Sequence, residues 1–177
     1  HESKAQVAEQ GMKSMLNLAI NPDNKRVFGD SNACALSKLV LQYNTDNDVA
    51  ATVEHTLRVI SSLSINPANQ VKLHEEGIAA ALQATLSRYC ESNVGIAEHS
   101  LRAIANLSCF DGNNTSFNEV GLCSTVVKCM SVLGKSTASI AECSLRAVVN
   151  MAVADGNKTK LGEDGACEAV VELLRVH

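Results

Sequence analysis

The sequence repeats one pattern of polar and apolar residues four times. A glutamate is followed four residues later by a cation and after four more by a polar residue, and successive glutamates lie 45, 44 and 44 residues apart. The four sets are Glu9, Lys13 and Asn17; Glu54, Arg58 and Ser62; Glu98, Arg102 and Asn106; and Glu142, Arg146 and Asn150. A period of about 40–47 residues is typical of stacked helical units, none of which buries its apolar face alone. The repeat therefore predicts an elongated solenoid with a long exposed surface.

Each unit is expected to hold three helices. In the unit at 66–109, Asn66 and Pro67 are typical of an N-cap followed by proline at the first helical position, and Gly77 of the turn that ends this short helix. A second helix over about 78–89 and a longer third helix over about 94–109 follow. Asp111 and Asp155 are the expected N-caps in the later units. The expected units of this single domain, 1–177, are 1–20 (the third helix of a partial unit), 21–65, 66–109, 110–154 and 155–177 (a partial unit).

The third helix is expected to have one packed face and one exposed face. At about 100° per residue, the glutamate, cation and polar residue of each set share an arc of about 80°, opposite apolar residues such as Leu101, Ile104 and Leu107. Because the pattern recurs at the stacking period, the exposed faces of the four units should line up along one wall.

Composition and charge exclude several classes of partner. Hydrophobic residues make up 46% of the chain and aromatic residues only 3%, so we expect a core of aliphatic side chains. The net charge of −4 argues against nucleic acid as a partner, because phosphate binding needs a basic surface. The sequence has no signal-peptide pattern and no apolar run of the roughly 18–20 residues that direct membrane insertion requires.

The cysteines indicate a reducing compartment. The chain has seven, an odd number without a disulfide-framework spacing. Cys34, Cys123 and Cys167 share one position in the unit, where we expect small buried apolar side chains. We therefore expect a cytoplasmic protein, with the nucleus as the alternative.

The stretches 101–108 (LRAIANLS) and 145–152 (LRAVVNMA) resemble the third helix of the armadillo repeat. The segment 66–70 (NPANQ) is similar to the start of its first helix, and 165–174 (GACEAVVELL) to its second helix. The resemblance, to proteins of the β-catenin and importin-alpha type, implies an all-α, right-handed α-solenoid of stacked three-helix armadillo repeats. HEAT repeats, with two helices in each unit, are the alternative that the glycine turn disfavours.

The resemblance also implies a function: a protein–protein interaction scaffold or adaptor that binds an extended peptide along the concave groove of the third helices. The asparagine of that helix would hold the peptide backbone, a role that Ser62 is too short to fill. Solvation, or a hydrogen bond to a neighbouring helix, is the alternative for these asparagines. The expected groove residues are Lys13, Asn17, Arg58, Ser62, Arg102, Asn106, Arg146 and Asn150, with His55 and His99 at the groove rim.

The cations of the groove set predict the charge of its ligand. Nuclear-import adaptors of this family carry tryptophan four residues before the asparagine, in slots for lysine side chains. Here the same positions hold Lys13, Arg58, Arg102 and Arg146, which repel lysine and suit an acidic partner. Alternatively, each cation pairs with the glutamate four residues before it, a contact worth only about 0.3–0.5 kcal/mol.

No catalytic motif occurs in the sequence, so we expect no enzyme activity and no cofactor. His55, His99 and Cys143 occupy matching places in different units, about 8–10 Å apart, whereas zinc ligands lie within about 2.0–2.3 Å of one ion, so we expect no metal site. The last expected helix, 166–176, lacks a polar outer face. Alternative functions are therefore a structural or self-assembling spacer of a longer solenoid, with end-to-end self-association, or a regulatory repeat array of a larger enzyme.

Overall fold

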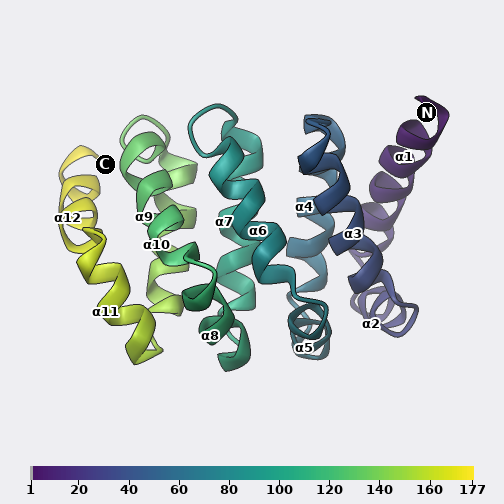
Figure 1. Cartoon of the computed structure of the whole chain (residues 1–177). Helices are drawn as coiled ribbons and strands as arrows, with labels where there is room; N and C mark the ends of the chain where they lie inside the picture. The colour runs from purple at the N-terminus through teal and green to yellow at the C-terminus, as the bar shows by residue number, and fades with distance from the viewer. Residues whose placement is uncertain (1) are drawn as a thin grey trace.

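The computed structural model describes residues 2–177, with side chains from Gln6 onward. His1, the first residue of the expected first unit, lies outside the described residues. Within this range the chain forms twelve helices and no strand (Figure 1). The helices are α1 (Glu2–Leu18), α2 (Pro22–Asp30), α3 (Ala33–Asp46), α4 (Ala50–Leu63), α5 (Pro67–Glu75), α6 (Ile78–Tyr89), α7 (Val94–Leu107), α8 (Asp111–Glu119), α9 (Leu122–Leu133), α10 (Ala138–Met151), α11 (Asp155–Glu163) and α12 (Ala166–Val176).

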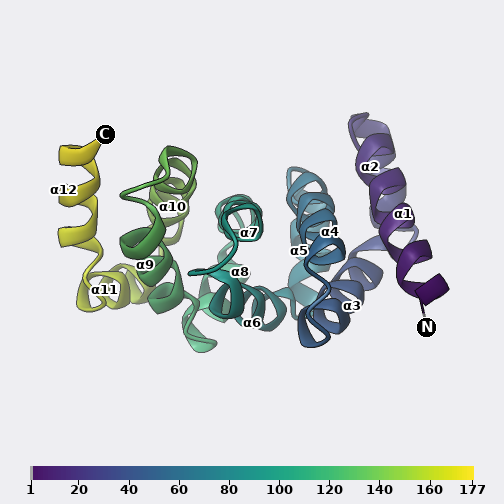
Figure 2. The same ribbon diagram turned by 90° about the horizontal axis from the view of Figure 1, so that it is seen from above.

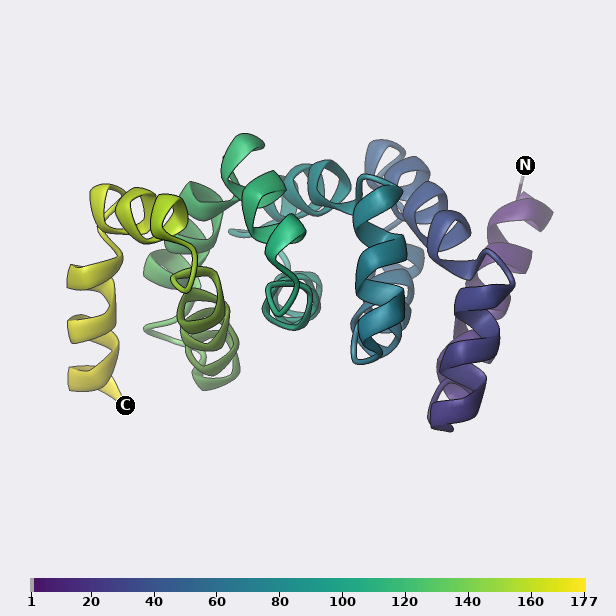
Figure 3. The ribbon, with the colours of Figure 1, turned by 90° about the horizontal axis from the view of Figure 1, so that it is seen from below.

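The helices stack in a curved row, so the predicted all-α solenoid is confirmed. The short first helices α2, α5, α8 and α11 run along one edge, at the bottom of Figure 1. From above and from below, the row of helices forms an arc (Figures 2 and 3). The third helices α4, α7 and α10 lie on the concave side of this arc, and the second helices α3, α6 and α9 lie on its convex side. Because α7 packs against both α4 and α10, the third helices form a continuous wall.

The first helices begin in two different ways. Asn21 and Asn66 are N-caps whose side-chain oxygens accept hydrogen bonds from backbone N–H groups at 2.8 and 2.9 Å, and a proline follows each of them. The prediction that Asp111 and Asp155 are N-caps was wrong. Each aspartate lies one residue further on, at the first helical position, where its negative charge is favourable beside the N-terminus.

The turn between the first and second helices uses the left-handed backbone region in every unit. Gly77, Gly121 and Gly165 have φ of 72°, 75° and 90°, and Asn32 has φ of 62° at the matching position. Glycine pays no steric cost there, and asparagine tolerates the region better than most other residues. The predicted glycine turns are therefore confirmed.

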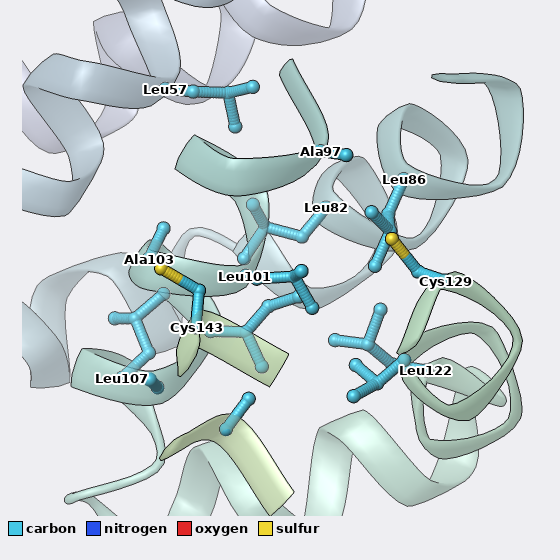
Figure 4. Close-up of a cluster of buried hydrophobic side chains, with 14 of the residues drawn as sticks. Leu57, Leu82, Leu86, Ala97, Leu101, Ala103, Leu107, Leu122, Cys129 and Cys143 are labelled. Atoms are coloured by element: carbon cyan, nitrogen blue, oxygen red, sulfur yellow. The ribbon is translucent and has the colours of Figure 1, made fainter. Parts of the chain in front are cut away.

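The core is aliphatic and runs through the whole stack. Side chains of α4, α6, α7, α9 and α10 gather in one cluster, in which alanine and cysteine lie between leucines (Figure 4). Leu101 of α7 has no exposed surface, and neither does Phe117 of α8, the largest of the fully buried side chains. Small side chains such as Ala97 and Ala103 let the third helices approach closely.

A second set of asparagines caps the C-terminal ends of the third helices. The side-chain amides of Asn24, Asn69 and Asn113 donate to the backbone carbonyl six residues before each of them, at 3.0, 3.2 and 3.0 Å. These carbonyls have no partner within their own helix. Asn69 also donates to the carbonyl of Lys25 in the preceding unit, at 3.0 Å, so it joins two units.

The cysteine prediction is confirmed at two of its three positions. Cys34 and Cys123 are buried, and burial raises the pKa of each thiol to about 11. The prediction was wrong for Cys167, which lies exposed on α12.

Candidate functional site

The concave face contains a groove of about 540 Å³ along the third helices. Its lining consists of Leu16, Arg58, Ser61, Ser62, Ile65, His99, Arg102, Asn106 and Arg146. Five of the eight predicted groove residues and the predicted rim residue His99 therefore share one groove. The other predicted residues, Lys13, Asn17, His55 and Asn150, lie on α1, α4 and α10 but outside this lining.

The helix period explains why these polar side chains reach the groove. On α4 and α7, Leu57 and Leu101 precede Arg58 and Arg102 by one residue and are fully buried, whereas both arginines are exposed. Arg146 of α10 is exposed in the same way. A step of one residue turns the side chain by about 100°, so burial of the leucine directs the arginine toward the concave surface.

Two of the four cations form the expected pair with the glutamate four residues earlier. Lys13 pairs with Glu9, and Arg102 Nη2 lies 2.8 Å from Glu98 Oε1. Both pairs are partly exposed, so each contributes little to stability.

The pairing prediction was wrong for the other two cations. Arg146 Nη2 donates to Asn106 Oδ1 of the preceding third helix, at 3.2 Å. Glu54 forms no ion pair with Arg58 and lies 4.0 Å from His99 Nε2 of the following unit. Among the side chains described, those of residues 6–177, no carboxylate lies within ion-pair distance of Arg58. Arg58 therefore places an uncompensated positive charge in the groove.

The polar residues after these cations join neighbouring third helices. The side-chain amides of Asn106 and Asn150 donate to the carbonyls of Ser61 and Ala105, one unit back, at 3.0 and 2.7 Å. Ser62 donates to a carbonyl of the first unit at 3.3 Å. The structure thus shows the expected alternative, a bond to a neighbouring helix. An amide has two N–H donors and a carbonyl acceptor, so one such bond leaves capacity for a ligand.

The two predicted rim histidines differ in their surroundings. Burial lowers the pKa of His99, and the positive charges of Arg58 and Arg102 lower it further, although the carboxylates of Glu98 and Glu54 oppose the shift. The His99 side chain is therefore neutral near pH 7. His55 instead donates from Nδ1 to the carbonyl of Ala51, at 2.6 Å.

Three residues of the lining were missed by the sequence prediction: Leu16, Ser61 and Ile65. We call the polar residues that end the four repeated sets, Asn17, Ser62, Asn106 and Asn150, the ladder residues. Leu16 and Ser61 each precede a ladder residue by one position, and the sequence shows no shared chemistry at that position. The sequence does hold a signal for Ile65, because an apolar residue recurs at the same position of each repeated unit.

Metal-binding and membrane-spanning features are absent from the described part of the chain. No group of three or more His, Cys, Asp or Glu side chains there lies close enough to hold a metal ion. None of the helices described is long and apolar enough to cross a bilayer.

A scan against protein-family models gave no match, and a search of curated proteins gave none either. Solved structures do match. A designed armadillo repeat protein in complex with the peptide (KR)4 has a TM-score of 0.78 and 21% identity, over 93% of this chain and 66% of that chain. Computationally designed armadillo repeat proteins for modular peptide recognition give 0.79 and 21%, over 93% and 67%. An engineered protein gives 0.82 and 16%, over 94% and 65%.

These likenesses establish the fold. The chain has an armadillo-like repeat fold, as the resemblance of its third helices implied, and it spans about two thirds of the length of these neighbours. A shared fold at this level of identity carries no function by itself, so the function has to be argued from the groove.

Proposed function

We propose that this chain is a protein–protein interaction scaffold whose concave groove binds an extended, acidic peptide segment. One observation carries the proposal: Arg58, Arg102 and Arg146 line the same groove, and Arg58 lacks a carboxylate partner among the described side chains. A guanidinium group binds a carboxylate through two parallel N–H donors, so an acidic side chain is the complement that this surface lacks.

The other two arginines strengthen the case for an acidic ligand. Arg102 is held by a partly exposed pair with Glu98, and Arg146 by a neutral amide. Contacts of this kind are worth about 1 kcal/mol or less, so a ligand carboxylate can replace them. The free acceptor and donor capacity of Asn106 and Asn150 would then serve the backbone of the ligand.

The matching structures support a peptide as the ligand but not its negative charge. The peptide (KR)4, which is in complex with one of the designed armadillo repeat proteins, is basic. In the present chain the groove itself is basic, so we propose that it binds a peptide of opposite charge.

End-to-end association is the alternative use of this solenoid. Leu36, Leu39 and Tyr43 are exposed on α3 near one end of the row, and Val171 and Leu174 on α12 at the other. We prefer the groove because it combines apolar surface with an uncompensated charge, which gives it a ligand of definite chemistry.

The test is a calorimetric titration with two peptides of equal length, (DE)4 and (KR)4, at low and at high salt. We expect (DE)4 to bind and (KR)4 not to bind. The affinity for (DE)4 should fall as salt rises, because dissolved ions screen the attraction between exposed charges. The Debye screening length is about 10 Å at 0.1 M salt and shortens as salt is added. Light scattering run on the same samples should show a monomer throughout. Equal or tighter binding of (KR)4 would refute the proposed ligand charge, and growth in mass with protein concentration would favour end-to-end association.

A further inference from the structure

An exposed apolar residue recurs at one position of every unit, directly after the third helix. Ile20, Ile65 and Val153 are 77%, 61% and 72% exposed, and Cys109 is exposed at the fourth place. We call these four residues the apolar row. Successive members lie 45, 44 and 44 residues apart, and each follows the polar ladder residue of its unit by three positions.

The fold itself gives no reason for this row. A single exposed apolar residue is ordinary, but four at one repeated position are not explained by chance scatter. The residue before an N-cap often packs against an apolar residue at the fourth helical position. Here those fourth positions are Lys25, Gln70, Asn114 and Lys158, all of them polar. The apolar row therefore serves no such local contact.

The apolar row meets the groove at Ile65, one of its four members. Ile65 lines the same groove as Arg58, and the half-buried Leu16 lies beside it in the lining. In each unit the cation, the ladder residue and the apolar residue follow one another at intervals of four and three residues. At a rise of about 1.5 Å per residue, each cation lies about 6 Å before the ladder residue of its helix. The apolar residue comes after the end of that helix, so it follows the ladder residue on the side away from the cation.

We propose that the ligand of this groove is an extended segment in which acidic and aliphatic residues alternate. Successive side chains of an extended chain point to opposite sides. A backbone that follows the ladder residues then directs its acidic side chains toward Arg58, Arg102 and Arg146, and its aliphatic side chains toward the apolar row. This inference rests on the proposed function and adds aliphatic side chains to the acidic ones that the ligand is proposed to carry.

The experiment compares two synthetic peptides of equal length and charge, an alternating Asp-Leu peptide and an alternating Asp-Ser peptide, by fluorescence anisotropy. We expect the Asp-Leu peptide to bind roughly tenfold more tightly, because burial of several leucine side chains adds apolar area to the contact. The variant Ile65→Ser should bind the Asp-Leu peptide roughly fivefold more weakly than the parent protein does. Its affinity for the Asp-Ser peptide should be almost unchanged. Val132→Ser is the matched control, since Val132 is also exposed but lies on α9, outside the groove.

The outcomes separate this inference from the proposed function. Equal affinity for the two peptides, or an unchanged Asp-Leu affinity in Ile65→Ser, overturns the alternating ligand while the acidic groove stands. Loss of affinity in Val132→Ser as large as in Ile65→Ser also overturns it. If neither peptide binds, the proposed function fails and this inference fails with it. Because Ile65 is exposed, thermal unfolding of Ile65→Ser should match the parent protein, and this measurement confirms that the variant folds.

Discussion

The variant Arg58→Glu should bind an acidic peptide roughly 30-fold more weakly than the parent protein, because it replaces attraction by like-charge repulsion at the centre of the groove. Its stability should hardly change. Arg58 is exposed, and its guanidinium makes no ion pair with the described side chains, so its removal breaks no such pair. Calorimetry with (DE)4 gives the affinity, and thermal unfolding gives the stability.

A matched control separates local charge from total charge. Arg26→Glu makes the same change on α2, where the parent arginine is 67% exposed and pairs with Asp30. We expect its affinity for (DE)4 to stay within about twofold of the parent, because the site lies outside the groove and salt screens it. Equal losses in the two variants would show that net charge, and not the groove, determines binding. Arg102→Glu should also weaken binding, but it removes the pair with Glu98 as well.

Replacing Phe117 by alanine should lower the free energy of unfolding by about 3–5 kcal/mol, the largest stability effect that we expect from a single change. Phe117 is fully buried on α8 and is the largest of the fully buried side chains. Its removal leaves a cavity inside a stack in which each unit depends on its neighbours. Urea unfolding followed by circular dichroism measures the change.

The repeat supplies the control for this variant. The matching positions on α5 and α11 hold Leu73 and Leu161, both buried. Phe117→Leu should therefore cost only about 1 kcal/mol, because leucine already suits this place in the unit. A cost below about 1 kcal/mol for Phe117→Ala would mean that the units pack more loosely than the structure shows.

The fold could be predicted from the sequence because the fold is periodic. A spacing of 44 or 45 residues, together with a glycine or asparagine in the left-handed turn, predicts stacked helices, and the second helix of the unit at 66–109 begins and ends as expected, at Ile78 and Tyr89. The burial of Leu101 next to the exposed Arg102 also follows from the helix period alone.

Side-chain pairing could not be predicted in the same way. The same i, i+4 pattern gives a pair at Glu98 and Arg102 but not at Glu54 and Arg58, where Glu54 lies 4.0 Å from His99 of the next unit. Such choices depend on side chains about one repeat period apart in the sequence, and the competing contacts differ by less than about 1 kcal/mol. Ile65 was missed for a different reason, since it belongs to the connection between helices and not to a helix face.

The concave wall of third helices is the proposed binding surface, and chemical-shift mapping of the backbone amides tests this most directly. With (DE)4 added to saturation, we expect the shifted amides to cluster on α4, α7 and α10, with the largest changes around Arg58 and Arg102. Shifts concentrated on the convex helices α3, α6 and α9, or spread evenly over the chain, would contradict a ligand bound in the groove.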